Sequence, residues 1–249
     1  MIQERFQRIK SVLQKRQTDL TLCLEHIHKP QNVSAILRTC DAVGIHEVNI
    51  VWNEHTYFRK GTAMGTQRWL RHLKHQSIDT AHQHFKQQDM QVLVTNLSDN
   101  SVDFRDIDYT RPTAIVMGQE KHGASAEAIA LADQEIVIPM MGMVQSLNVS
   151  VAAALILYEA QQQRQKAGLY DKVRISDEDL NALLFEGCHP ALFAQAKAKH
   201  LPIPQLDENG EVQASEQWWQ AMQLSQTSDS ARPDTSGKTA TDDDLFSNI

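Results

Sequence analysis

The chain has few cysteines, no long apolar run and no apolar leader, and each shortage excludes a class of protein. Its three cysteines, Cys23, Cys40 and Cys188, are odd in number and far apart, which argues against a disulfide framework and against a zinc ribbon. No apolar run reaches the roughly 18 residues that a membrane span requires. The first residues, MIQERFQRIK, lack the apolar region of a secretory signal. We therefore expect a cytoplasmic protein.

Histidine is plentiful, but its spacing does not indicate a metal site. The eleven histidines include short pairs such as His26 with His28 and His72 with His75. The sequence has no HExxH motif and no cysteine at the spacing of a zinc site. We expect no metal.

The charge of the chain is distributed unevenly. Of 249 residues, 41% are hydrophobic and 22% charged, which is typical of a soluble globular protein. Residues 201–249 carry nine acidic and two basic side chains, a balance equal to the net charge of −7, so residues 1–200 are neutral. The first sixteen residues nevertheless hold five basic side chains against one acidic one. Such an arm suits either nucleic-acid binding or a solvated helix face.

Apolar spacing predicts strands that alternate with helices. Strands are expected over residues 20–27, 46–52, 69–74, 90–97, 113–117 and 135–139, and helices over 2–17, 32–43, 77–88, 125–131 and 149–165. This alternation predicts an α/β fold with a mostly parallel sheet and helices on both faces. The helix over 149–165 is apolar almost all round, which predicts that it is buried. Further helices should open at Ser176, begin at Pro190 and carry Trp218, before a disordered acidic tail from residue 225.

The first candidate site is the segment NVSAILRTCDAVG, which begins at Asn32. Asn32 and Ser34 are helix-capping types, and Arg38, six residues after Asn32, lies about 120° around the helix from it. One interpretation is an N-capped helix with an ion pair between Arg38 and Asp41. The other is an anion site in which Arg38 binds a phosphate.

Two further segments follow predicted strands. The sequence MGQEKHGAS leaves a strand at the edge where open α/β sheets bind ligands, and Gly118 and Gly123 have the spacing of a P-loop. Ala124 replaces the P-loop lysine, so a nucleotide triphosphatase is not expected, and Glu120 is either a site residue or a surface turn. The segment IPMMGMVQSLNVS is either an ordinary loop and helix cap or an apolar slot for a ligand with an adenine ring.

Together and in this order, NVSAILRTCDAVG, IVMGQEKHG and IPMMGMVQSLNVSVAAALILYE resemble the three motifs of the SpoU branch of the SPOUT RNA methyltransferases. The resemblance covers roughly residues 1–224 and leaves the acidic tail without a counterpart. It implies a parallel α/β sheet with a deep trefoil knot at about residues 113–165, which no packing rule predicts. It also implies a homodimer that uses S-adenosylmethionine.

The resemblance assigns site residues. The cofactor is expected at three loops, on Thr95, Asn96, Leu97, Gly118, Gln119, Ile138, Pro139, Met140, Leu147 and Asn148. The reaction is methyl transfer to a ribose 2′-hydroxyl, with catalytic roles for Arg38, Asn32, Glu120, Ser146 and Asn148. The family assigns removal of the 2′-hydroxyl proton to the arginine that matches Arg38. Arginine is an unusual base, because its pKa lies above about 12. Arg38 is therefore expected either to act as the base or to orient a phosphate.

The resemblance also implies the substrate, which is the D-loop guanosine at position 18 of tRNA. A methyltransferase domain at 19–168 is expected between an N-terminal helix at 1–18 and a C-terminal extension at 169–224, both contacting tRNA. The basic candidates are Arg5, Arg8, Arg16, Arg164, Lys166, Lys172 and Arg174. Two alternatives remain: the same chemistry on ribosomal RNA, and a non-catalytic RNA-binding protein on the same scaffold. The intact polar residues of the three motifs argue against the second.

Overall fold

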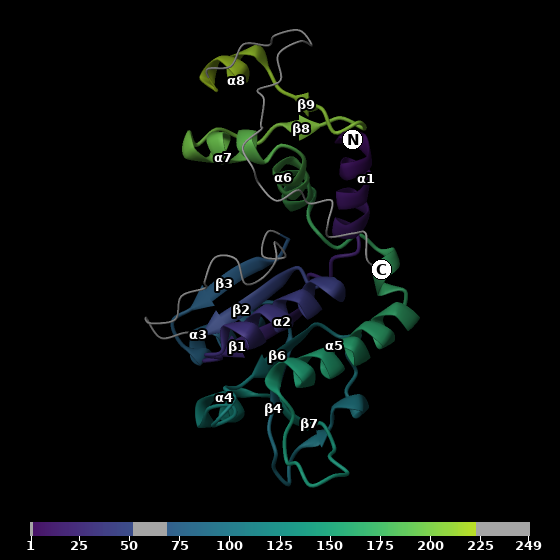
Figure 1. Ribbon diagram of the computed structural model, residues 1–249, viewed down its shortest axis with the longest axis vertical. Coiled ribbons are helices and arrows are strands. Elements are labelled where there is room, and N and C mark those ends of the chain that lie inside the picture. The colour runs from purple at the N-terminus through teal and green to yellow at the C-terminus, as the bar shows by residue number, and fades with distance from the viewer. Residues whose placement is uncertain (1, 52–68, 223–249) are drawn as a thin grey trace.

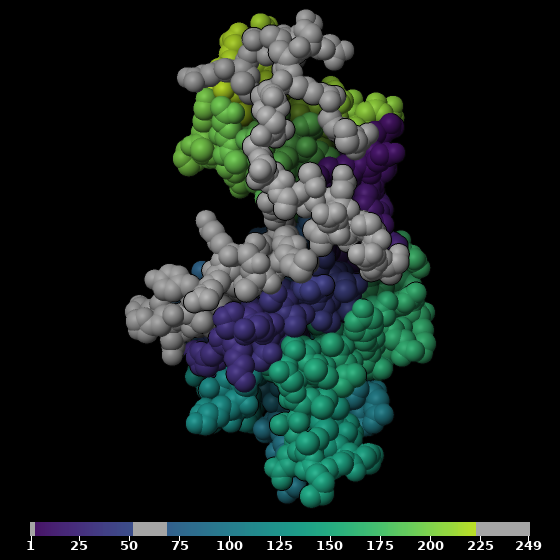
Figure 2. Space-filling view, in the orientation of Figure 1, coloured from purple at the N-terminus to yellow at the C-terminus, as the bar shows by residue number. Residues whose placement is uncertain are grey.

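The computed structural model describes residues 2–51 and 69–222, which form two lobes stacked along the long axis (Figures 1 and 2). The larger lobe is built on a parallel sheet. The smaller lobe places the first helix of the chain beside its last helices (Figure 1). No helix in these two ranges is long and apolar enough to cross a membrane.

The seven strands of the large sheet are all parallel, in the spatial order β3-β2-β1-β6-β4-β7-β5. They are β1 (Leu20–Glu25), β2 (Glu47–Val51), β3 (Arg71–His75), β4 (Gln91–Thr95), β5 (Val102–Asp103), β6 (Thr113–Met117) and β7 (Gln134–Val137). Every residue of the central strands β1 and β6 is buried, because helices cover both faces. The predicted parallel α/β sheet is confirmed, and β5 is a strand that the sequence did not predict.

Two pairs of helices cover the sheet. Helices α2 (Pro30–Ala42) and α5 (Val149–Lys166) pack together on one face, whereas α3 (Ile78–Gln87) and α4 (Ala126–Leu131) pack together on the other. Along β1 the side chains alternate between these layers, so that Leu22 and Leu24 join the core of α2 and α5 while Cys23 joins the other core. The 3-10 turns Phe104–Asp106 and Leu169–Asp171 complete this lobe.

Two predictions about helices are wrong. Helix α5 was expected to be buried, but Val151, Leu155 and Tyr158 are 46%, 43% and 54% exposed and share one side of it. The sequence shows that α5 is apolar all round, but not whether a neighbour within the chain covers each side. Helix α1 (Ile2–Leu13) ends at Leu13 and not at residue 17. The chain after it enters the large lobe, where the backbone N–H of Gln17 donates to Gly44 O over 2.7 Å.

The small lobe is held together by apolar contacts between the two ends of the described chain. Phe6, Ile9 and Leu13 of α1 pack on Leu184 of α6 (Asp177–Cys188). Beyond α6 lie α7 (Pro190–Ala198), an antiparallel hairpin of β8 (Gln205–Leu206) and β9 (Val212–Gln213), and α8 (Glu216–Ala221). The tail predicted from residue 225 lies outside the described residues, and the trefoil knot stays a prediction.

Candidate active site

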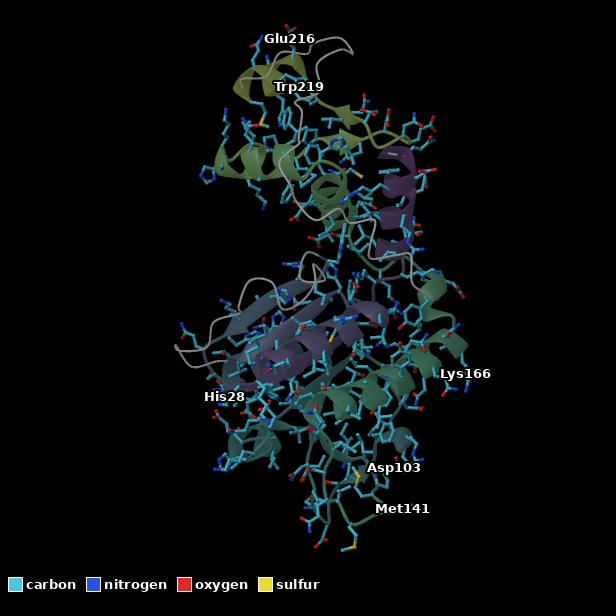
Figure 3. The ribbon with its side chains drawn as sticks, in the orientation of Figure 1. His28, Asp103, Met141, Lys166, Glu216 and Trp219 are labelled. Carbon is cyan, nitrogen blue, oxygen red and sulfur yellow. The ribbon has the colours of Figure 1, made fainter. Side chains whose placement is uncertain are left out.

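The three predicted loops meet at the carboxyl edge of the sheet. Thr95 ends β4 and residues 96–97 follow it, residues 118–120 follow β6, and residues 138–148 follow β7. These three strands are neighbours in the sheet. Because the strands are parallel, their carboxyl ends share one edge, where open α/β sheets bind ligands. In Figure 3, Met141 of the third loop lies at one end of the molecule and Trp219 of the small lobe at the other.

A chain of hydrogen bonds joins the three sequence motifs. Asn32 Nδ2 donates to Glu120 Oε1 over 2.7 Å, and Asn148 Nδ2 donates to Asn32 Oδ1 over 3.1 Å. Asn148 Oδ1 accepts from the backbone N–H of Ser150 and so caps α5. The structure therefore brings together three of the five residues that were expected to be catalytic.

Asn32 does not cap its helix, contrary to the capping interpretation. The N-cap of α2 is Lys29, which makes no side-chain cap, and Pro30 opens the helix. Proline suits this position because its missing N–H has no partner there. Asn32 is 7% exposed and directs its amide at Glu120.

Glu120 is held as a carboxylate. Partial burial raises its pKa, but hydrogen bonds from Asn32 and from backbone N–H groups outweigh burial and keep the pKa below its usual value. One of these backbone donors is the N–H of Lys29, 3.4 Å from Glu120 Oε1. Glu120 thus accepts hydrogen bonds from the backbone of Lys29, at the N-cap position of α2, and from the side chain of Asn32 in the first turn of that helix.

The loop that carries Glu120 is a tight hairpin. Gln119 and Gly123 exchange two backbone hydrogen bonds of 3.0 Å. Gly123 has φ +70°, and a Cβ on Gly118 would lie 2.1 Å from Ala124 N, so both positions require glycine. We refer to residues 118–125 as the Glu120 hairpin.

The first loop is shaped by a carboxylate that the sequence analysis missed. Asn96 Nδ2 and Ser98 Oγ both donate to Glu135 Oε2 over 2.7 Å, and these bonds lower the pKa of Glu135, with that from Ser98 the stronger. The Asn96 side chain therefore shapes the loop, while Leu97 is 66% exposed. A lone glutamate within a strand carries no sequence signal of this role.

The third loop combines exposed apolar side chains with unused backbone groups. Met141, Met143 and Val144 are 96%, 99% and 60% exposed, and Leu147 is half-buried. Within the described ranges, residues 139–147 form no backbone hydrogen bond. Their N–H and C=O groups can therefore bind a ligand.

Arg38 lies on the exposed side of α2, away from the helix residues Val33, Ile36 and Leu37, which face the core. It is on the same helix as Asn32, so the hydrogen-bond chain that fixes Asn32 also fixes the start of the helix that carries Arg38. Ser146, the fifth residue expected to be catalytic, is exposed in the third loop.

Two of the expected RNA contacts are corrected by the structure. Arg16 and Arg164 are fully buried. Arg164 Nη1 donates to Asp19 Oδ1 over 2.6 Å, and Arg16 Nη1 donates to Ile45 O over 2.9 Å. Their guanidinium groups bind acceptors inside the protein and cannot reach RNA. Basic composition alone does not distinguish buried arginines from exposed ones. Arg174 is partly exposed and pairs with Asp19. The exposed members of the set are Arg5, Arg8, Lys166 and Lys172.

A cavity of about 570 Å³ lies away from the three loops, at the amino edge of the sheet. Asp108, Arg111 and Asp133 are among its lining residues, and none of the predicted site residues lines it. No three His, Cys, Asp or Glu side chains are grouped as for a metal ion within the part of the chain that the structure describes.

Comparisons with known proteins agree with this arrangement. Residues 19–158 match the SpoU rRNA methylase family, and residues 162–215 match the C-terminal family of SpoU rRNA methylases. The tRNA (guanosine(18)-2′-O)-methyltransferase of Escherichia coli K12 is 54% identical over 222 residues, which cover 88% of this chain and 97% of that protein.

Two solved structures are also similar. The TrmH/SpoU tRNA modifying enzyme of Aquifex aeolicus has a TM-score of 0.70 and 40% identity, over 76% of this chain and 97% of that one. The SpoU methyltransferase AviRb of Streptomyces viridochromogenes, in complex with the cofactor AdoMet, has a TM-score of 0.55 and 26% identity, over 60% of this chain and 62% of that one.

Proposed function

We propose that this chain, which belongs to the SpoU rRNA methylase family, transfers a methyl group from S-adenosylmethionine to the ribose 2′-hydroxyl of guanosine 18 in tRNA. The observation that carries the proposal is the hydrogen-bond chain Asn148–Asn32–Glu120, which joins the three motifs at one edge of the sheet. The name of the Escherichia coli relative supports the choice of tRNA over ribosomal RNA. A tRNA substrate also supports the expected cytoplasmic location.

The residues at the carboxyl edge fit the proposed cofactor. Leu97, Met140 and Leu147 offer apolar surface for an adenine ring, and the unused backbone groups of residues 139–147 offer hydrogen bonds to the polar ends. The proposed cofactor loops are completed by Gly118, Gln119, Ile138 and Pro139, and by Thr95 and Asn96, which precede Leu97. S-adenosylmethionine supplies an already activated methyl group when bound.

The protein itself must align the ribose and accommodate a weakly acidic proton. We assign Arg38 to the ribose and its phosphate, because it projects from the same helix as the fixed Asn32 and is exposed. Glu120 and Asn148 orient Asn32. Ser146, which is exposed in the third loop, is assigned to the nucleotide pocket. The pH dependence of an Arg38→Lys variant distinguishes proton removal by residue 38 from binding of the phosphate.

The small lobe is proposed to bind tRNA. Arg5 and Arg8 on α1 are exposed basic side chains that can neutralise phosphates, as are Lys166 at the end of α5 and Lys172 beyond it. Residues 1–18 and 169–224 then form the RNA-binding extension of a methyltransferase domain at 19–168, in which we also propose the trefoil knot.

The protein is proposed to act as a homodimer. Val151, Leu155 and Tyr158 form an exposed apolar stripe on α5, which crosses the front of the large lobe in Figure 2. A second copy of the chain that packs on this stripe would bury it. Tyr158→Glu should therefore yield a monomer in analytical ultracentrifugation, whereas an unchanged mass would place the interface elsewhere.

The test of function is methyl transfer from labelled S-adenosylmethionine to separate pools of tRNA and ribosomal RNA, with Arg38→Ala as the inactive control. Label in tRNA alone supports the proposal. Label in ribosomal RNA alone would support the other substrate, and no label in either would support a non-catalytic RNA-binding protein.

A further inference from the structure

Glu25 is a buried carboxylate at the same edge of the sheet as the proposed active site. It is the last residue of β1 and is 3% exposed. A carboxylate removed from water requires hydrogen-bond donors. Both of its oxygens bind one residue: Oε2 accepts from the backbone N–H of Ser125 over 2.9 Å, and Oε1 accepts from Ser125 Oγ over 2.5 Å.

Ser125 is the point at which the Glu120 hairpin ends. Its Oγ accepts from the backbone N–H of Ala128 over 3.0 Å, so it also caps α4. The other end of the hairpin leaves β6 at Met117, which pairs with Leu24 of β1. Both ends of the hairpin are therefore tied to consecutive residues of β1, one by sheet pairing and the other by the Glu25 carboxylate.

Between these anchors, the hairpin has little freedom. The two bonds between Gln119 and Gly123 close it, and Glu120 beside them meets Asn32 over 2.7 Å. A hydrogen bond weakens steeply when the distance or angle changes, so movement of the hairpin would break the contact between Glu120 and Asn32.

We propose that Glu25 is a positioning residue: by holding Ser125 it fixes the Glu120 hairpin, and through Glu120 it fixes Asn32 and the start of the helix that carries Arg38. The inference rests on the proposed methyltransferase function. Glu25 acts through the hairpin and has no assigned contact with substrate or cofactor.

A purely structural carboxylate provides the matched control. Asp133 accepts from the backbone N–H of Val92 over 2.7 Å and from Lys86 Nζ over 2.6 Å. Like Glu25 it pairs one backbone donor with one side-chain donor, but its side chain is exposed and it lies at the amino edge of the sheet, where it lines the cavity. Asp133→Asn therefore measures the cost of losing such a carboxylate far from the hairpin.

The experiment compares Glu25→Gln, Ser125→Ala and Asp133→Asn with the wild-type protein. Thermal unfolding gives Tm, calorimetry gives the Kd for S-adenosylmethionine, and tRNA methylation gives kcat. Glutamine keeps the shape of Glu25 but turns one accepting oxygen into a donor. We expect Glu25→Gln and Ser125→Ala to lower kcat by about tenfold or more, and Asp133→Asn to change kcat by less than about twofold.

Two further measurements test the route of the effect. In a Glu120→Gln background, Glu25→Gln should lower kcat by no more than about twofold, because the contact that it positions is already altered. Amide hydrogen exchange at Gln119 and Gly123 should accelerate in Glu25→Gln and stay unchanged in Asp133→Asn, and this readout needs no substrate.

The proposal is overturned if Glu25→Gln lowers Tm but leaves kcat and amide exchange in the hairpin unchanged. It is also overturned if the losses of Glu25→Gln and Glu120→Gln multiply. Failure of the proposed function has a different signature: wild-type protein would neither bind S-adenosylmethionine nor methylate tRNA, while the exchange measurement would still show whether Glu25 holds the hairpin.

Discussion

The side-chain amide of Asn32 donates to Glu120 Oε1 over 2.7 Å, although 88 residues separate them in the chain. The other end of the same amide accepts from Asn148, so Asn32 uses both of its polar atoms to join segments that follow three different strands. The orientation of Asn32 is therefore determined by its two partners.

Asn32→Asp should inactivate the enzyme, because it places a second carboxylate against Glu120 and replaces an attractive contact with repulsion. We expect a loss of kcat of about a hundredfold or more, measured at saturating tRNA and cofactor. Adding Glu120→Gln restores a donor opposite the new carboxylate and should recover part of the loss. A double variant as inactive as Asn32→Asp would show that the contact does not limit the reaction.

The pKa of Glu120 predicts how the hairpin responds to acid. Its pKa in the folded protein lies below its usual value, so ionised Glu120 stabilises the fold above the unfolded pKa of about 4.3, and this stabilisation is lost as the pH falls through the folded pKa. The difference in unfolding free energy between wild type and Glu120→Gln should shrink as the pH is lowered below 4.3 or so. Urea unfolding over a pH series measures it, and a difference that does not depend on pH would contradict the assignment.

Arg38→Lys separates the two roles of Arg38. Lysine has a pKa near 10.4, so if residue 38 takes the proton, the activity of the variant should rise steeply as the pH approaches 10. If residue 38 only orients a phosphate, the ammonium keeps part of the activity at neutral pH and loses it as it deprotonates. In both cases Arg38→Ala should abolish methyl transfer and leave the Kd for S-adenosylmethionine nearly unchanged. A large loss of cofactor affinity with turnover retained would contradict both roles.

Leu147→Asp should weaken cofactor binding, because it places a carboxylate in the apolar slot proposed for adenine. Leu147 is half-buried just before α5. We expect the Kd for S-adenosylmethionine to rise by more than about tenfold, or roughly 1.4 kcal/mol, in calorimetry. Unchanged affinity in a folded variant would show that adenine binds at another part of the carboxyl edge of the sheet.

Arg8→Glu should weaken tRNA binding and flatten its dependence on salt, because each lost phosphate contact reduces the number of counterions released. Arg8 is exposed on α1. The measurement is tRNA affinity over a salt series. A deletion of residues 226–249, which carry five acidic side chains, is the companion variant and should raise affinity slightly at low salt. Normal binding by Arg8→Glu, with binding lost on the deletion, would assign the RNA contact to the tail.

Local chemistry predicted most of the fold. Serine is a preferred helix N-cap, and the side chain of Ser77 accepts from the backbone N–H of Thr80 in a capping box that opens α3. Glycine is common just after a helix, and Gly168 follows α5 with a φ of +68°. The alternation of strands and helices predicted the parallel sheet. The order of its strands was not predictable, because apolar runs such as TAIVM show that a strand is buried but not which strands are its neighbours.

The site was predicted in part. The resemblance named Asn32, Glu120 and Asn148, and the structure joins them. Glu25 and Glu135 could not be found in this way, because each acts on a loop distant in sequence and neither lies within a motif. The prediction that Arg16 and Arg164 contact RNA was wrong for a related reason. A buried arginine needs several acceptors that are distant in the sequence, and no local pattern shows them. Arg164 binds three of these acceptors, Tyr109 O, Gln17 Oε1 and Asp19 Oδ1.

The most direct test of the account is to locate the methyl group. Purified protein, S-adenosylmethionine and an unmodified tRNA transcript are incubated, and nuclease fragments are analysed by mass spectrometry. A matched transcript carries 2′-deoxyguanosine at position 18. The account predicts one methyl group on the ribose of guanosine 18 and none on the deoxy transcript. A methyl group on a base or on another ribose, or methylation of the deoxy transcript, would contradict it.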